Sequence, residues 1–306
     1  MVGPTGVSVR APAVAGSFYP QAAAECRSTA IGLLNAAVIA NRGLGLGQSD
    51  FPPAYAGGIV PHAGWICSGV VAGQTIAAIA AGRPDVQVIV VFGAIHVPME
   101  VDRAMLDTFD RWSEPIGDAI PPGELRRKLS GTAASFATDD RFHQREHAVE
   151  VELPLLQLAW PGVPILAVQT PPIESAVEIG HQTARAVKAM GLRAVYLASS
   201  DLTHYGPQYR FSPWGVGIAA LERAKENDRH VLQAVTDMRP EAVVPIVRAE
   251  FSACGAGAIA AMMAACQECG ATHARLLRHT NSFETLAGLV DHGSDNAVGY
   301  AAVVVG

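Results

Sequence analysis

Two segments in which a short apolar run ends at an isolated histidine constrain the fold of this chain most strongly. The first, GGIVPHAGWICSG at residues 57–69, carries His62 between a proline and a glycine. The second, VQVIVVFG at residues 86–93, is almost entirely apolar and leads to His96 just before a proline. Proline and glycine break regular structure, so each histidine is predicted to lie on a turn directly after a buried strand. In open α/β sheets, sites are built at that end of the strands.

Strand-like and helix-like segments alternate along the rest of the chain. This pattern predicts an α/β fold with a largely parallel or mixed central sheet and helices on both faces. No linker, internal repeat or low-complexity tract divides the 306 residues, so we expect a single domain over 1–306, with residues 1–12 as a flexible start. Glycine-rich phosphate-binding motifs are absent.

Composition excludes several classes of partner. The formal net charge is −6 and no large basic cluster is present, which argues against nucleic acid. No segment reaches the roughly 20 apolar residues of a membrane span, and the nearest, Ala256–Cys266, is predicted to be a buried helix. The N-terminus lacks the pattern of a secretory signal, and five irregularly spaced cysteines favour reduced thiols. We therefore expect a cytoplasmic protein that does not bind membranes.

A third strand-like segment, residues 193–199, runs into the sequence SSDLTHYG. It brings Asp201 and His204 into one loop. A histidine near a carboxylate is suited to general acid or base catalysis, because its unperturbed pKa is about 6.5 and the carboxylate can orient the ring. The alternative is structural: Asp201 caps the turn and His204 binds a backbone carbonyl.

Cys254 lies in SACGAGA, at the start of an apolar helix-like segment. This position favours a low-pKa thiolate, although a buried structural cysteine is the alternative. A thiolate with two imidazoles suits Fe(II), Zn(II) or Cu(I), and ligand type alone does not choose among them. Nearby acidic and imidazole groups are either partners that orient the metal ligands or a polar edge: Glu146, His147 and Glu150.

Taken together, these motifs resemble one family over nearly the whole chain. AVAGSFYP, PHAGWICSG, EHAVEVELPLLQ, SSDLTHYG, CGAG and NAVGYAAVVVG follow the order and character of MEMO proteins, including protein B of the AmmeMemoRadiSam system. MEMO proteins are similar in fold to class III extradiol dioxygenases, which open catechol-type rings with O2 at a non-haem Fe(II). The resemblance therefore implies a site at one edge of an α/β sheet.

The resemblance also implies residue roles. His62, His96 and Cys254 would bind the metal, with Glu250 as a fallback carboxylate ligand, because the dioxygenases use a carboxylate there. His204 would act as acid and base toward the substrate, held in register by Asp201. The expected aromatic walls of the substrate pocket are Trp65, Tyr205 and Phe18. The family's radical SAM and AMMECR-type associates are implied as pathway partners.

Two departures from the family pattern concern the substrate. Ala94 and Ile95 stand where the family has a Ser-His-like stretch, and Ala256 stands where it has an arginine. Both changes remove polar groups near the expected pocket.

Three functions follow as expectations. The first is an enzyme, an Fe(II)-dependent oxygenase that acts on a catechol-like aromatic with O2; Cu and Zn are the other candidate metals. The second is a zinc-dependent hydrolase with Glu146 or Glu150 as the base. The third is a non-catalytic module that binds a peptide or small ligand beside a redox-active metal.

Overall fold

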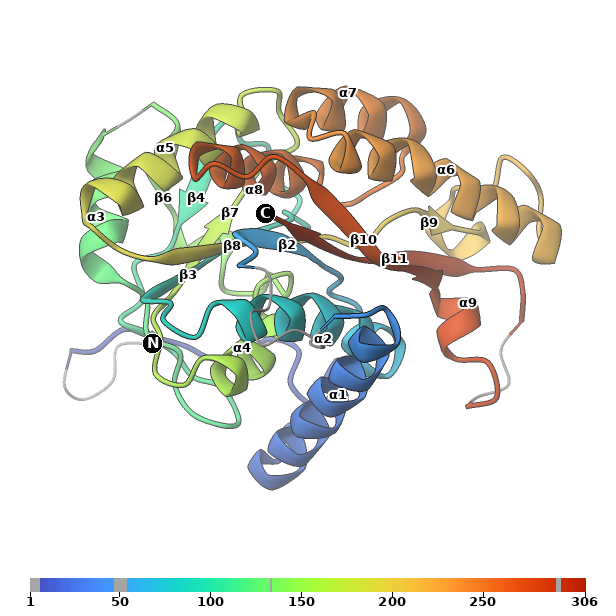
Figure 1. Cartoon of the computed structure of the whole chain (residues 1–306), viewed down its shortest axis with the longest axis horizontal. Helices are drawn as coiled ribbons and strands as arrows, with labels where there is room; N and C mark the ends of the chain where they lie inside the picture. The colour runs from blue at the N-terminus through green and yellow to red at the C-terminus, as the bar shows by residue number, and fades with distance from the viewer. Residues whose placement is uncertain (1–5, 47–53, 133, 290–292) are drawn as a thin grey trace.

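A mixed nine-stranded sheet forms the centre of the protein (Figure 1). The computed structural model describes residues 6–46, 54–132, 134–289 and 293–306. The strand order is β10-β11-β2-β8-β3-β7-β4-β6, and β9 pairs with β11 at one end. The strands of this sheet are β2 (Gly57–Val60), β3 (Val88–Gly93), β4 (Ala104–Leu106), β6 (Phe136–Thr138), β7 (Ile165–Gln169), β8 (Ala194–Ser199), β9 (His204–Tyr205), β10 (Ala274–Asn281) and β11 (Ala297–Val305).

The four central strands β2, β8, β3 and β7 are parallel and fully buried, as their continuous apolar sequences predict. Their register places three strand ends at one level. Val60 of β2 and Gly93 of β3 both pair with Ser199 of β8. The residues that follow these strands therefore emerge side by side at one edge of the sheet.

Helices cover both faces, which confirms the predicted fold class (Figure 1). One face carries α5 (Ala176–Ala189), α8 (Ala256–Glu268), α7 (Pro240–Glu250) and α6 (Ile218–Thr236), with α3 (Gly123–Thr132) beside them. The other carries α1 (Ala23–Gly43), α2 (Trp65–Gly82) and α4 (Leu153–Ala159). A short helix, α9 (Ser282–Thr285), follows β10.

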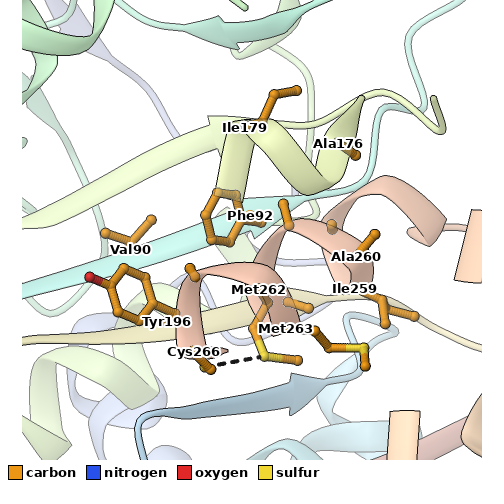
Figure 2. Close-up of a cluster of buried hydrophobic side chains, with 14 of the residues drawn as sticks. Val90, Phe92, Ala176, Ile179, Tyr196, Ile259, Ala260, Met262, Met263 and Cys266 are labelled. Atoms are coloured by element: carbon orange, nitrogen blue, oxygen red, sulfur yellow. Dashed lines mark hydrogen bonds between the residues drawn. The ribbon is translucent and has the colours of Figure 1, made fainter. Parts of the chain in front are cut away.

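The helix α8 is buried along its length, as predicted from its apolar sequence. Figure 2 shows Ile259, Met262 and Met263 of this helix beside Phe92 and Tyr196 of the sheet. Thus α8 begins beside Cys254 and is fixed by the core behind it.

Among the described residues, α2 is the one helix long and apolar enough to cross a membrane. It is longer than Ala256–Cys266, the segment that the sequence indicated as nearest to a membrane span. It lies between the sheet and α1, and 61% of it is buried within the protein. This is the placement of a core helix in a folded domain.

The prediction of a flexible start is wrong for residues 6–12, and residues 1–5 lie outside the described residues. Val9–Arg10 forms β1, parallel to β5 (Arg111–Trp112). The Arg10 side chain is only 1% exposed and lies 2.6 Å from the carboxylate of Glu150. It also donates hydrogen bonds to the carbonyls of His143 and Glu146. A buried guanidinium needs such partners, so this segment is held against the core.

Candidate metal centre

Three side chains from separate parts of the chain form a compact donor set. The ligand atoms offered by His62, His96 and Cys254 all lie within 4.8 Å of one another. His62 follows β2, His96 follows β3 and Cys254 precedes α8. The two rings meet edge to face with centroids 5.1 Å apart, and Cys254 Sγ lies 3.3 Å from His62 Nε2. The level ends of β2 and β3 thus bring together the residues that the sequence singled out.

Ser199 fixes the orientation of His62. The Ser199 hydroxyl donates to the carbonyl of Ala148, and its oxygen lies 2.8 Å from His62 Nδ1. Because the one hydroxyl proton is used in the bond to Ala148, Ser199 must accept a proton from Nδ1–H of the ring. In the neutral ring the lone pair is therefore on Nε2, and this is the atom that faces Cys254.

Glu146 plays the same part for His96. Its carboxylate accepts from the His96 ring at Nδ1 (2.8 Å) and from the His96 backbone N–H (2.6 Å). It also accepts from the backbone N–H groups of His147 and Ala148. Burial opposes the charge of Glu146, but these bonds with His96 outweigh it and lower the pKa to about 2. A carboxylate on the far nitrogen of a histidine is a common arrangement around bound metals.

Cys254 has the character of a thiolate. Burial alone would raise its pKa, but His62 and His96 together lower it to about 6. The backbone N–H of Asp201 donates to the sulfur at 3.3 Å. Gly255 lets the thiol approach this strand end, because a Cβ at that position would lie 2.6 Å from the side chain of Ser200.

His147 is a third imidazole at the same place. Its ring stacks on that of His96 with centroids 4.6 Å apart, and it lies edge-on to His62 at 5.3 Å. Burial and these two neighbouring rings lower the pKa of His147 to about 3, so its ring is neutral. Together with His96 and Glu146 it forms a second, overlapping donor set.

Asp201 does not hold His204, contrary to the expectation. The Asp201 carboxylate accepts from the backbone N–H of His62 at 2.9 Å, so it orders the His62 turn instead. Burial raises the pKa of Asp201. His204 pairs through Nδ1 with the carbonyl of Leu202 at 3.1 Å. Since that carbonyl can only accept, Nδ1 carries a proton, and in the neutral ring Nε2 of His204 is the acceptor.

Two cavities meet at His204. One, of about 510 Å³, is lined by Phe18, His147, Asp201 and His204 together with hydroxyl and amide side chains. The other, of about 380 Å³, is lined by Cys254, His204 and apolar side chains. Tyr209 lines both cavities and contacts the His204 ring edge to face. The predicted residues Asp201, His204 and Phe18 therefore do border space next to the donor set.

Two of the three predicted aromatic walls lie elsewhere. The Trp65 side chain is buried in the core and donates from its indole N–H to the carbonyl of Val151. Tyr205 is also buried; it donates to the carbonyl of Gly215 and stacks on Trp214. Adjacent residues on a strand point to opposite sides, so His204 reaches the cavity and Tyr205 does not.

Glu150 and the fallback ligand Glu250 are also placed away from the donor set. Glu150 accepts from the backbone N–H groups of Ala13 and Val14 and pairs with Arg10, so it holds the N-terminal segment. Glu250 lies 2.9 Å from a nitrogen of His230. Glu150 begins a 3₁₀ turn that leads into α4, and its carboxylate points to the N-terminal segment, so of the three expected partners it does not orient a metal ligand.

Sequence reasoning missed three contributors. Ser199, which orients His62, was quoted only as part of a motif. Tyr209 and Tyr300 line the larger cavity; Tyr209 lies outside the motifs, and Tyr300 was quoted only within NAVGYAAVVVG. The serine could have been suspected, because it ends a buried strand whose neighbours both carry a histidine; the tyrosines had no such signal.

Comparison with known proteins supports the resemblance. The family described as "Memo-like protein" matches residues 10–304. A MEMO1 family protein of Methanococcoides burtonii is 33% identical over 97% of this chain and 100% of its own length. One from Methanosarcina mazei is 32% identical over 98% and 100%, and one from Pyrococcus abyssi is 29% identical over 97% and 99%. The chain belongs to the Memo-like family.

Proposed function

We propose that this protein is a non-haem Fe(II) oxygenase that acts on a catechol-like aromatic substrate. The observation that carries the proposal is the donor set of His62, His96 and Cys254, whose ligand atoms lie within 4.8 Å of one another. Both histidines have their second nitrogen engaged, by Ser199 and by Glu146, which leaves Nε2 of each ring for a metal. The lowered pKa of Cys254 provides an anionic sulfur.

These residues fit a divalent metal. Three protein ligands leave coordination positions open, and Fe(II) bound there would supply sites for O2 and for the two hydroxyl oxygens of a catechol. A cavity of about 510 Å³ beside the set has the size of a small-molecule site.

His204 is the proposed acid and base. Its Nε2 is the acceptor nitrogen, and its ring borders both cavities. It can hold the proton that a substrate hydroxyl loses on binding and return it later to the product. Loss of such a group usually costs about 10²–10⁴ in rate.

The contacts of Glu146 and Glu150, the two candidate bases, make the hydrolase alternative less favoured. Glu146 accepts four hydrogen bonds from His96, His147 and Ala148, three of them at one oxygen, so most of its acceptor capacity is used. Glu150 is buried against Arg10 and the N-terminal segment. Neither carboxylate is placed to activate a water.

The first test is metal content after anaerobic purification, for the native protein and for Cys254→Ser. The matched control is Cys269→Ser, because Cys269 is an exposed thiol outside the donor set. We expect near-stoichiometric iron in the native and control proteins and little in Cys254→Ser. Oxygen uptake with a panel of catechols then tests the activity, and His204→Gln should retain iron but lose turnover.

Other outcomes contradict the proposal in different ways. Stoichiometric zinc with no dependence on oxygen would favour a hydrolase. Absence of metal even after anaerobic reconstitution with Fe(II) would refute the oxygenase and leave a non-catalytic binding module.

A further inference from the structure

The smaller of the two cavities next to the donor set is apolar. It has a volume of about 380 Å³ and lies between α7 and the segment that follows β9. Its apolar side chains include Val244 and Val247 of α7, Phe211, and Phe251, Ala253 and Ala256 before and at the start of α8. A cavity of about 150 Å³ holds a benzene ring in other proteins, so this one can take a ring or a short alkyl chain with room to spare.

The cavity opens directly onto the reactive groups. Cys254 and His204 both belong to its wall. Ala256, the first residue of α8, is 1% exposed and has only a methyl group on this side of Cys254. A larger residue here would occupy the space next to the sulfur.

Two aromatic rings form its rim. Phe251 is 66% exposed although it is large and apolar, and its backbone is left-handed with φ at 54°. Its ring lies 5.5 Å from that of Phe211, centroid to centroid. The left-handed backbone is explained by the end of α7, which Phe251 caps. The exposed phenyl ring is unfavourable in water, and an apolar group bound in the cavity would cover it.

The two cavities differ in the charged and polar groups of their walls. Besides His204, the apolar cavity has a basic side chain in Arg248, which is 61% exposed and lies 3.3 Å from a carboxylate oxygen of Glu174, so that its charge is paired at the rim. The larger cavity has apolar residues as well, but it also carries the carboxylate of Asp201 and polar groups such as those of Asn296 and Ser282. A substrate that spans both would have a hydroxylated end and an uncharged apolar end, with His204 between them.

We propose that the cavity beside Cys254 binds an uncharged alkyl or aryl substituent, so that the substrate class is a hydroxylated aromatic with an apolar side chain. This inference uses the proposed function only for the identity of the metal-bound end. The filling of the cavity itself does not require metal.

The test measures binding of matched probes to the metal-free protein and, anaerobically, to the Fe(II)-loaded protein by titration calorimetry. The probes are 4-methylcatechol, 4-butylcatechol and 3-(3,4-dihydroxyphenyl)propionate. Full burial of a methylene is worth about fourfold in affinity. We expect the butyl probe to bind at least about tenfold more tightly than the methyl probe, and the propionate probe to show no such gain.

Two variants fill the cavity from different walls: Ala256→Leu and Val247→Phe. Each should remove most of the gain for the butyl probe, and circular dichroism checks that each is folded. The matched control is Leu286→Phe, which adds bulk in the larger cavity and should keep the gain.

The outcomes separate this inference from the proposed function. A butyl gain in the metal-free protein that both filling variants remove supports the cavity assignment, even if iron or oxygen uptake is absent and the oxygenase proposal fails. Equal affinity for the methyl and butyl probes, or a gain that survives both variants, overturns it. Tighter binding of the propionate probe that is lost in Arg248→Met also overturns it, because the cavity would then select an anion.

Discussion

Removal of the Ser199 hydroxyl should weaken metal binding without removing any metal ligand. Ser199 is fully buried; it donates to the Ala148 carbonyl and accepts from His62 Nδ1 at 2.8 Å. In Ser199→Ala the imidazole loses the group that fixes both its orientation and the tautomer whose Nε2 carries the lone pair. Loss of such a partner typically costs 10–100-fold in metal affinity, which is about 1.4–2.7 kcal/mol. The unpaired buried groups should also lower the free energy of unfolding by about 1–3 kcal/mol.

The assay is an anaerobic Co(II) titration, in which the thiolate-to-cobalt absorption band reports binding to Cys254, with a competing chelator to set the affinity range. The matched control is Ser252→Ala. Ser252 is also fully buried, but its hydroxyl has no hydrogen-bond partner within the part of the chain that the structure describes. We expect wild-type affinity in the control. Equal affinities for the two variants would refute the reasoning that Ser199 orients His62.

Three further substitutions test buried side chains and a turn around the donor set. His143 is fully buried, and burial lowers its pKa to about 4, so between pH 4 and 6.5 the folded state binds fewer protons than the unfolded state. The free energy of unfolding should therefore fall by up to about 3 kcal/mol as the pH falls through that window. In urea melts at pH 4.5 and 7, His143→Gln should reduce this dependence on pH. Glu150→Gln leaves the buried Arg10 without its nearest anion and should cost about 3 kcal/mol or more in the same melts at pH 7; an unchanged midpoint would contradict the ion pair. Gly255→Ala places a methyl group 2.6 Å from Ser200 and should displace Cys254, with at least about tenfold weaker Co(II) binding; an unaltered cobalt spectrum would show that the turn can adapt.

Much of the architecture was readable from the sequence because the core strands carry a strong local signal. The runs that became β2, β3 and β8 are short, apolar and closed by proline, glycine or serine, which is typical of buried parallel strands. The burial of α8 followed from the alanine-rich, uncharged sequence of Ala256–Cys266. Residues 6–12 were misjudged because two short strands and one buried arginine are a weak local pattern whose partners lie more than 100 residues away.

The composition of the candidate site was determined by the sequence alone: two histidines after strands, one cysteine before a helix, and an Asp-x-x-His loop, together with membership of the Memo-like family. Only the tertiary structure decided which atoms meet. The common register of Val60, Gly93 and Ser199 sets the distances within the donor set, and hydrogen bonds from distant segments select the nitrogen that each ring presents. Local sequence specifies local conformation, whereas register and hydrogen-bond partners arise from packing between segments far apart in the chain. For the same reason Asp201 was expected to hold His204 but binds the His62 turn instead.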